Sequence, residues 1–542
     1  MKGQGVHLDL AITNANVITV DGRMTRAEAV GVVGERILMV GSNSEVGTYI
    51  GPNTRVVDAQ GRALVPGFQD SHMHPLLVGQ WGRSVQLEGA KNIPELLQRV
   101  KERADATPKG QMILGYGWNQ ELMEERRYPT RWEVDSVAPD NPVFLLHWNG
   151  HIYLINTLLM EQKGITDSTP SPEGGEMNRN GRGEFTGVLL EKAVDLVMPG
   201  FVESGAGLIA TLEEVKDALR FTADQAVRLG LTSLVDILAS DVQVKAYQEL
   251  EREGRLPVRI SYYLSNHYLD RAVDVGLQSG FGDEKLHLAG IKVVSDGSLS
   301  SHTAALRRPY VDMPQTSGVM RFTPEEVREI VLKATANGLR VDVHALGDRA
   351  VEVVLDAFRE ARDRHHPKDP RFKISHCIIL GEDLIQEMAE LGVVASVQPC
   401  FVMGGMHWIP RQVPPEVAKY AHAFRSLIDA GVHCCGGTDA PICPMNPLLN
   451  MYAAVTRKDP KGLPEGGWHP EQRVSPEEAL RMVTIEGAYS TGDERSRGSI
   501  EVGKLADLAL LSDDPLSVMP DKIKDIKNLM TIVGGKVVYS SI

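Results

Sequence analysis

The chain has 542 residues and a formal net charge of −14, from 57 Lys and Arg against 71 Asp and Glu. Hydrophobic residues make up 42% and charged residues 24%, which is typical of a globular protein and excludes a largely disordered one. The acidic balance argues against nucleic acid or an anionic membrane as a partner, since both favour a basic surface.

The first residues lack the charged, apolar and small-residue sections of a signal peptide. No uncharged apolar run reaches the roughly 18 residues that span a bilayer. The 5 cysteines all fall in the last third of the chain and do not resemble a disulfide framework. We therefore expect a soluble, reduced, cytoplasmic protein, with a homodimer as the default assembly.

Both ends of the chain are rich in predicted strands. At the N-terminus these are residues 8–20, 29–41 and 54–61, and at the C-terminus 498–512 and 531–540. We predict one small composite β-sandwich domain from residues 1–62 and 490–542. Two unrelated end domains are the alternative, which is less favoured because each would be short for a stable core.

The middle of the chain alternates apolar strand candidates with amphipathic helical stretches. This pattern predicts an α/β fold, a (β/α)₈ barrel of the TIM type, over residues 63–80 and 206–489. The strand candidates are residues 63–70, 231–237, 258–264, 291–296, 339–345, 372–377, 393–399 and 432–439.

Residues 81–205 interrupt this alternation and hold elements of their own, such as 112–118. We interpret them as a large insertion after the first barrel strand, long enough to cap the barrel mouth. In the competing interpretation, residues 142–147 form a barrel strand, which gives nine candidates for eight places.

The strongest local motif is Asp70-Ser71-His72-Met73-His74, at the end of an apolar strand. Alternation along a strand puts His72 and His74 on one side, where neutral imidazoles can bind a metal such as Zn²⁺. A pair of hydrogen-bonded histidines is the alternative for an isolated motif of this kind.

Four more candidate ligands, Lys292, His344, His376 and Asp439, lie on or at the C-terminal ends of later strands. Barrel strands deliver these ends to one face, so the side chains are expected to converge, which favours the metal site. Asp439 could be a ligand and the general base for a metal-bound water, or a structural cap on the next turn.

Lys292 needs a separate explanation, because an ammonium group repels a metal. Its neighbours Ile291, Val293 and Val294 favour burial, which lowers a lysine pKa. A neutral amine can take up CO₂ to form a carbamate, an acidic bridging ligand. The alternative is a buried lysine paired with Asp296 or another carboxylate.

Five segments match, in order, the motifs of the amidohydrolase superfamily: PGFQDSHMHP, IKVVSDGSLSSHTAAL, VDVHALGDRAV, ISHCIIL and GGTDAPI. The residues of the second segment and of the insertion resemble those of the YtcJ-like branch, which includes N-substituted formamide deformylases. GSIEVGKLADLALL resembles the composite β-domain of the family, so the resemblance covers nearly the whole chain.

The resemblance implies a metal-dependent hydrolase with one or two divalent ions per chain, zinc being the most expected. His72, His74 and Asp439 would bind the first ion, and His344 and His376 the second. Carboxylated Lys292 would bridge the two ions. A hydroxide would attack the carbonyl, with Asp439 as general base and then as acid for the leaving nitrogen.

The chain also departs from that branch. His302 stands where many members have arginine, and His147-Trp148-Asn149-Gly150-His151 where they tend to have Arg-x-Asp-Gly-His. We predict substrate contacts for His302 and His151 and, as aromatic pocket residues, for Trp118 and Tyr116. A buried structural histidine or aromatic residue is the alternative at these positions.

The expected function is hydrolysis of a non-peptide carbon–nitrogen bond in a small-molecule amide, N-substituted or a formamide. Alternatives on the same centre are hydrolysis of a cyclic amide or a lactone, and deamination. A non-catalytic binding or regulatory protein is a further alternative, although every candidate ligand position is filled.

Overall fold

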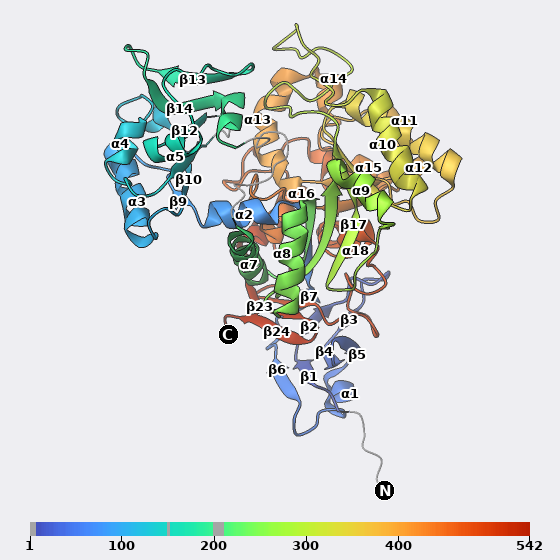
Figure 1. Ribbon diagram of the computed structural model, residues 1–542. Coiled ribbons are helices and arrows are strands. Elements are labelled where there is room, and N and C mark those ends of the chain that lie inside the picture. The colour runs from blue at the N-terminus through green and yellow to red at the C-terminus, as the bar shows by residue number, and fades with distance from the viewer. Residues whose placement is uncertain (1–6, 149–151, 199–210) are drawn as a thin grey trace. The chain divides into compact units, whose positions relative to one another are not determined.

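The computed structural model describes residues 7–148, 152–198 and 211–542 (Figure 1). It divides into two compact units, Met1–Pro75 with Ala223–Ile542, and Leu76–Thr222. Among the helices of the described residues, none is both long and apolar enough to cross a membrane.

The first unit contains an eight-stranded parallel sheet in which each strand pairs with the next along the chain. The chain around the C-terminal ends of the first and last strands of this sheet is also joined by backbone hydrogen bonds. The N–H of Asp439 donates to His72 O (2.7 Å), and that of His74 donates to Ala440 O (2.9 Å). The predicted TIM-type barrel is confirmed. Its strands are β8 (Phe68–Met73), β15 (Leu231–Ala239), β16 (Arg259–Ser265), β17 (Leu286–Val294), β18 (Val341–Ala345), β19 (Lys373–His376), β20 (Val394–Val397) and β21 (His433–Gly436).

Amphipathic helices cover the outside of this sheet (Figure 1). In α11, Val351, Val354 and Phe358 are buried at three- and four-residue spacing. Phe358 stacks on Phe372 with a centroid distance of 4.5 Å, which ties the helix to the start of β19. The helices between the strands include α8 (Asp241–Arg252), α10 (Pro324–Ala336), α11 (Asp348–His365), α12 (Glu382–Leu391) and α16 (Pro447–Thr456).

The predicted first strand, residues 63–70, is wrong in its boundaries, because the chain changes sheet at Gly67. The segment before it, β7 (Ala63–Pro66), pairs with β2 (Asn16–Ile18) and β22 (Leu508–Leu511) in a second sheet. A Cβ on Gly67 would lie 2.2 Å from the Thr232 side chain, so the crossing requires glycine.

Both termini build the remaining β-structure of this unit, as expected for a composite β-domain. Leu10, Val17 and Leu64 share one buried cluster with Leu508 and Ile532. One sheet has the order β24-β23-β22-β7-β2-β3 and the other β5-β4-β1-β6. The further strands are β1 (Leu10–Thr13), β3 (Arg26–Ala27), β4 (Ala29–Val33), β5 (Arg36–Gly41), β6 (Arg55–Asp58), β23 (Asn528–Val533) and β24 (Lys536–Ser540).

The second unit follows β8 in the chain and has its own sheet, of order β13-β14-β12-β11-β10-β9. Because β11 belongs to this sheet, the interpretation of residues 142–147 as a barrel strand is wrong. The exact domain boundaries and the capping role stay predictions. The strands are β9 (Val85–Gln86), β10 (Ile113–Trp118), β11 (Val143–His147), β12 (Ile152–Ile155), β13 (Gly175–Arg179) and β14 (Phe185–Glu191).

Candidate metal centre

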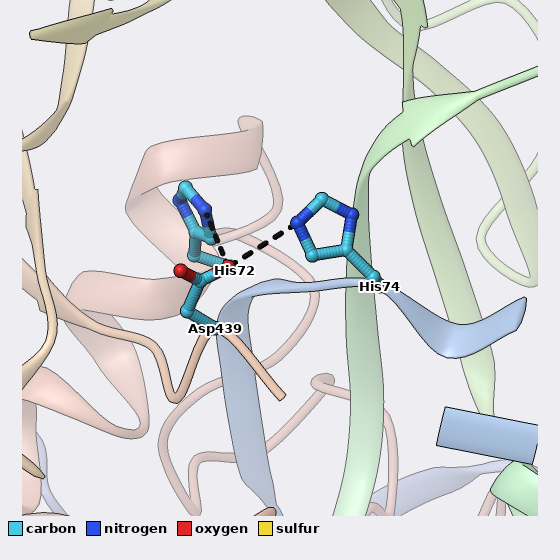
Figure 2. Close-up of side chains that lie close together, drawn as sticks. All are labelled: His72, His74 and Asp439. Carbon is cyan, nitrogen blue, oxygen red and sulfur yellow. Dashed lines mark ion pairs between the residues drawn. The ribbon is translucent and has the colours of Figure 1, made fainter. Parts of the chain in front are cut away.

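His72 of β8, His74 directly after that strand and Asp439, which follows β21, meet at the carboxyl edge of the barrel (Figure 2). Asp439 Oδ1 lies 3.4 Å from His72 Nε2 and 3.2 Å from His74 Nε2. One ligand atom from each residue fits within 4.8 Å of the others. Two imidazoles and a carboxylate at this spacing form a donor set suited to a divalent metal ion.

Asp70 holds the loop that carries Asp439. Its carboxylate accepts hydrogen bonds from Thr438 N (3.0 Å), Thr438 Oγ1 and His72 N (3.2 Å). Burial raises the pKa of Asp70 to about 6, against the effect of these donors. Our sequence interpretation assigned no role to Asp70, although its position two residues before His72 places it on the same strand end.

His344 of β18 and His376 at the end of β19 extend this group of imidazoles. These two strands pair with each other and not with β8. The ring centroid of His376 lies 4.7 Å from that of His72 and 4.6 Å from that of His344. His376 has φ 82° and Asp439 has φ 56°, a strained backbone for residues other than glycine. The structure therefore brings the predicted histidines of three strands together at this edge.

Hydrogen bonds fix which ring nitrogen of two of these histidines is free. His376 Nδ1 faces Gln398 Oε1 (2.7 Å), and His344 Nε2 faces Gly297 O (3.2 Å). Since these oxygens accept, the facing nitrogens carry the hydrogen, which leaves His376 Nε2 and His344 Nδ1 with lone pairs. In the described residues the buried His72 Nε2 makes no hydrogen bond. These unprotonated nitrogens fit a metal ion.

Burial also keeps the imidazoles neutral. It lowers the pKa of His72 to about 4 and that of His344 to about 3, and the pKa of His376 lies well below its usual range for the same reason. Because only neutral imidazole binds a metal, these side chains are ready to act as ligands at neutral pH.

Lys292 is buried and hydrogen-bonded to Asp342 Oδ1 (3.0 Å) and Ser375 Oγ (2.8 Å). Burial lowers its pKa, and the charge of Asp342 opposes this shift. The structure thus agrees with the alternative of a buried lysine paired with a carboxylate, although the partner is Asp342 and not Asp296. Asp296 instead accepts backbone N–H groups and lies 3.4 Å from His344 Nε2.

Asp342 has a second lysine partner, Lys373, whose Nζ lies 3.1 Å from Oδ2. Asp342 and Lys373 face each other in the register of β18 and β19. Sequence interpretation missed Asp342, Lys373 and Ser375. The available signal was their two-residue spacing, Asp342 before His344 and Lys373 before Ser375, which places each pair on one face of its strand.

The predicted substrate contacts are less uniform. Trp118 is fully buried in the core of the second unit and its indole N–H donates to Leu145 O (3.2 Å), so the structure gives it a packing role. Tyr116 stacks on Trp81 at 4.7 Å. His302 lies 3.1 Å from Asp312 through Nε2. His151 lies outside the described residues.

Asp236, a buried carboxylate of β15, accepts hydrogen bonds from Gln243 Nε2 (2.9 Å) and Tyr247 Oη (2.8 Å). Burial raises its pKa, and the charge of His74 is among the influences that lower it. Asp236 is therefore held by its own helix, α8, within electrostatic reach of His74.

Comparison with known proteins places the chain among hydrolases. A model of the amidohydrolase family matches residues 55–539. The N-substituted formamide deformylase of Arthrobacter pascens is 30% identical over 98% of this chain and 98% of its own length. The putative amidohydrolase YtcJ of Bacillus subtilis (strain 168) is 31% identical over 91% and 92%. An uncharacterized metal-dependent hydrolase from Pyrococcus furiosus is 31% identical, with a TM-score of 0.81 over 94% of this chain and 100% of that one.

Proposed function

Because the chain belongs to the amidohydrolase family, and is thus a hydrolase of carbon–nitrogen bonds other than peptide bonds, we propose that it cleaves an N-substituted amide or formamide. The observation that carries the proposal is the cluster of His72, His74 and Asp439, in which two imidazoles meet a carboxylate at the barrel edge. The similarity to a formamide deformylase over almost the full length supports the substrate class.

In this proposal His72, His74 and Asp439 hold one divalent ion, and His344 and His376 hold a second. Lys292, carboxylated by CO₂, would supply a further oxygen ligand. The burial of Lys292 supports the carbamate, because CO₂ reacts with the neutral amine that burial favours. Zinc is the proposed metal, since it accepts nitrogen and oxygen ligands together.

A bound ion of this kind lowers the pKa of water to about 7 and polarises a carbonyl oxygen. Asp439 is the proton carrier. Burial alone would raise its pKa, but the contacts with His72 and His74 hold that pKa well below its usual range. Asp439 is therefore ionised and able to accept a proton from the attacking water, and then to deliver it to the leaving nitrogen.

The first test is metal content per chain, by elemental analysis of protein purified without added metal or chelator. About two equivalents are expected. N-alkyl formamides and N-substituted acetamides are then assayed for amine release, with metal-depleted protein as the control. Release that continues at the same rate after metal depletion contradicts the proposed centre. Turnover of lactones or cyclic imides alone contradicts the proposed substrate class.

The carbamate is tested separately, by NMR of protein equilibrated with ¹³C-bicarbonate. We expect a carbamate carbonyl signal that Lys292→Arg removes, because a guanidinium does not add CO₂. A signal that persists in this variant contradicts the assignment to Lys292. The homodimer and the cytoplasmic location stay predictions, the former open to light scattering on the purified protein.

A further inference from the structure

We infer that Ser375, held by Asp342 and Lys373, is a positioning residue that selects the ring nitrogen His72 presents to the metal. The inference deepens the proposed function and rests on its metal centre. None of the three residues belongs to the proposed ligand set. All three are buried side chains of β18 and β19.

The selection follows from counting hydrogens around one hydroxyl. Ser375 Oγ lies 2.6 Å from Asp342 Oδ1, 2.8 Å from Lys292 Nζ and 3.0 Å from His72 Nδ1. The carboxylate can only accept, so Ser375 gives it the single hydroxyl hydrogen. The hydroxyl oxygen then accepts from Lys292 and from His72. His72 Nδ1 must therefore carry the hydrogen, and the lone pair is left on Nε2, the atom that faces Asp439.

Lys373 helps to fix the direction of the hydrogen bond between Ser375 and His72. A serine hydroxyl alone could either donate to a histidine or accept from it. Here Lys373 Nζ lies 3.1 Å from Asp342 Oδ2 and Lys292 Nζ lies 3.0 Å from Oδ1, so the carboxylate faces an amine group at each of its oxygens. Asp342 thus stays an acceptor, and Ser375 cannot turn its hydrogen toward His72.

Lys373 also fixes the backbone next to His72. Its Nζ donates to Ser71 O (3.3 Å) and lies 4.6 Å from the centroid of the Tyr263 ring. The carbonyl just before His72 and the His72 ring are therefore both held from β19. Partners of this kind, which orient a metal-binding histidine through its other nitrogen, typically contribute about 10–100-fold in metal affinity.

The test compares Ser375→Ala with Ser396→Ala. Ser396 is the residue opposite Ser375 in β20 and is equally buried, so it is a matched control. Zinc affinity is measured by competition with a chromophoric chelator, and thermal unfolding is measured on the metal-free proteins. We expect Ser375→Ala to weaken zinc binding about 10–100-fold, with Ser396→Ala unchanged and the two unfolding midpoints similar. Equal zinc affinity in the two variants would overturn the inference.

A second pair guards against misfolding. Threonine and valine have the same shape and differ in the hydroxyl, so Ser375→Thr should bind zinc more tightly than Ser375→Val by a similar factor. Because Ser375 also contacts Lys292, both serine-to-alanine variants are repeated in a Lys292→Met background. A loss of affinity that persists there acts through His72, and one that vanishes acts through Lys292 and refutes the inference.

Zinc binding needs no substrate, so the two proposals can fail independently. A wild-type chain that binds zinc but hydrolyses none of the amides removes the proposed substrate class and leaves the role of Ser375 intact. Amide turnover by the wild type, together with unchanged zinc affinity in Ser375→Ala, supports the substrate class and refutes the role of Ser375.

Discussion

Two sheets of this chain have predicted functional residues near their strand ends, and they use those positions differently. In the barrel sheet, His72, His344 and His376 come from separate strands, and their rings approach to 4.6–4.7 Å. In the sheet of the second unit, Trp118 also ends a strand with parallel neighbours, yet it is fully buried among apolar side chains. A closed barrel directs its strand ends to one centre, whereas an open sheet leaves an aromatic side chain to pack.

The backbone at these strand ends differs in the same way. In the barrel, His376 and Asp439 take positive φ although neither is glycine. In the second unit the positive φ next to Trp118 falls on Gly117, where it costs little. Backbone strain at a functional residue, at a position where glycine would relieve it, is typical of a site that must hold its side chains in a fixed arrangement.

The largest expected effect is that of Asp439→Asn, which keeps the size of the side chain but removes the proton acceptor. We expect kcat for amide hydrolysis to fall by about 10²–10⁴-fold, the usual contribution of general acid–base catalysis. Trp118→Phe is the control, since a packing residue should leave kcat unchanged. A large loss with Trp118→Phe and none with Asp439→Asn would reverse the comparison between the two sheets.

Trp118→Ala tests the packing role directly. The indole is fully buried, and removing a buried tryptophan typically costs about 3–5 kcal/mol of unfolding free energy. The expected result is a lower midpoint in urea unfolding, followed by circular dichroism, with KM unchanged in protein that remains folded. A raised KM with normal stability would restore the predicted pocket role.

The neutral histidines of the barrel predict a pH dependence in the metal-free protein. Burial lowers the pKa of His72 to about 4 and that of His344 to about 3, from 6.5 in the exposed side chain. Below about pH 6.5 the unfolded chain binds more protons than the folded one, so stability falls as the pH falls toward 4. The expected slope is about 1.4 kcal/mol per pH unit for each such histidine.

Urea unfolding at several pH values across this window measures that slope. His422 provides a control away from the metal centre, because burial lowers its pKa to about 3 as well. His422→Gln should reduce the slope by about 1.4 kcal/mol per pH unit, the contribution of one histidine. Burial raises the pKa of Asp70 to about 6 and that of Asp296 to about 7, so these carboxyls oppose the slope of the histidines. The decisive comparison is therefore between the wild type and His422→Gln, and equal slopes would mean that His422 titrates normally.

The barrel and the convergence of its histidines could be predicted because apolar strand candidates alternate with helical stretches, and several of these candidates have a histidine near their C-terminal end. The boundary at Gly67 was missed: Pro66-Gly67 interrupts the apolar run before Phe68, but the sequence alone does not show that the two halves of the run pair in different sheets. The periodicity of a sequence identifies strands, but pairing decides to which sheet they belong.

The contact between Asp342 and Lys373 also depends on how the strands pair. Asp342 and Lys373 are each plausible as isolated charged residues, and only the register of β18 and β19 sets them opposite each other. Cross-strand pairs are properties of the register, which a single sequence does not specify. The convergence of the histidines was therefore predictable, whereas the cross-strand contact between Asp342 and Lys373 was not.

The smallest expected effect concerns His302, which was predicted to contact substrate. Its Nε2 lies 3.1 Å from Asp312 Oδ1, in a pair whose side chains are 21% and 38% exposed. A partly exposed pair of this kind typically contributes about 0–1 kcal/mol, so His302→Gln should change the unfolding free energy by no more than that. A substrate contact would add a higher KM at unchanged kcat, and Asp312→Asn separates the two roles. If Asp312→Asn raises KM as much as His302→Gln does, the pair acts by shaping the loop, and His302 does not touch the substrate.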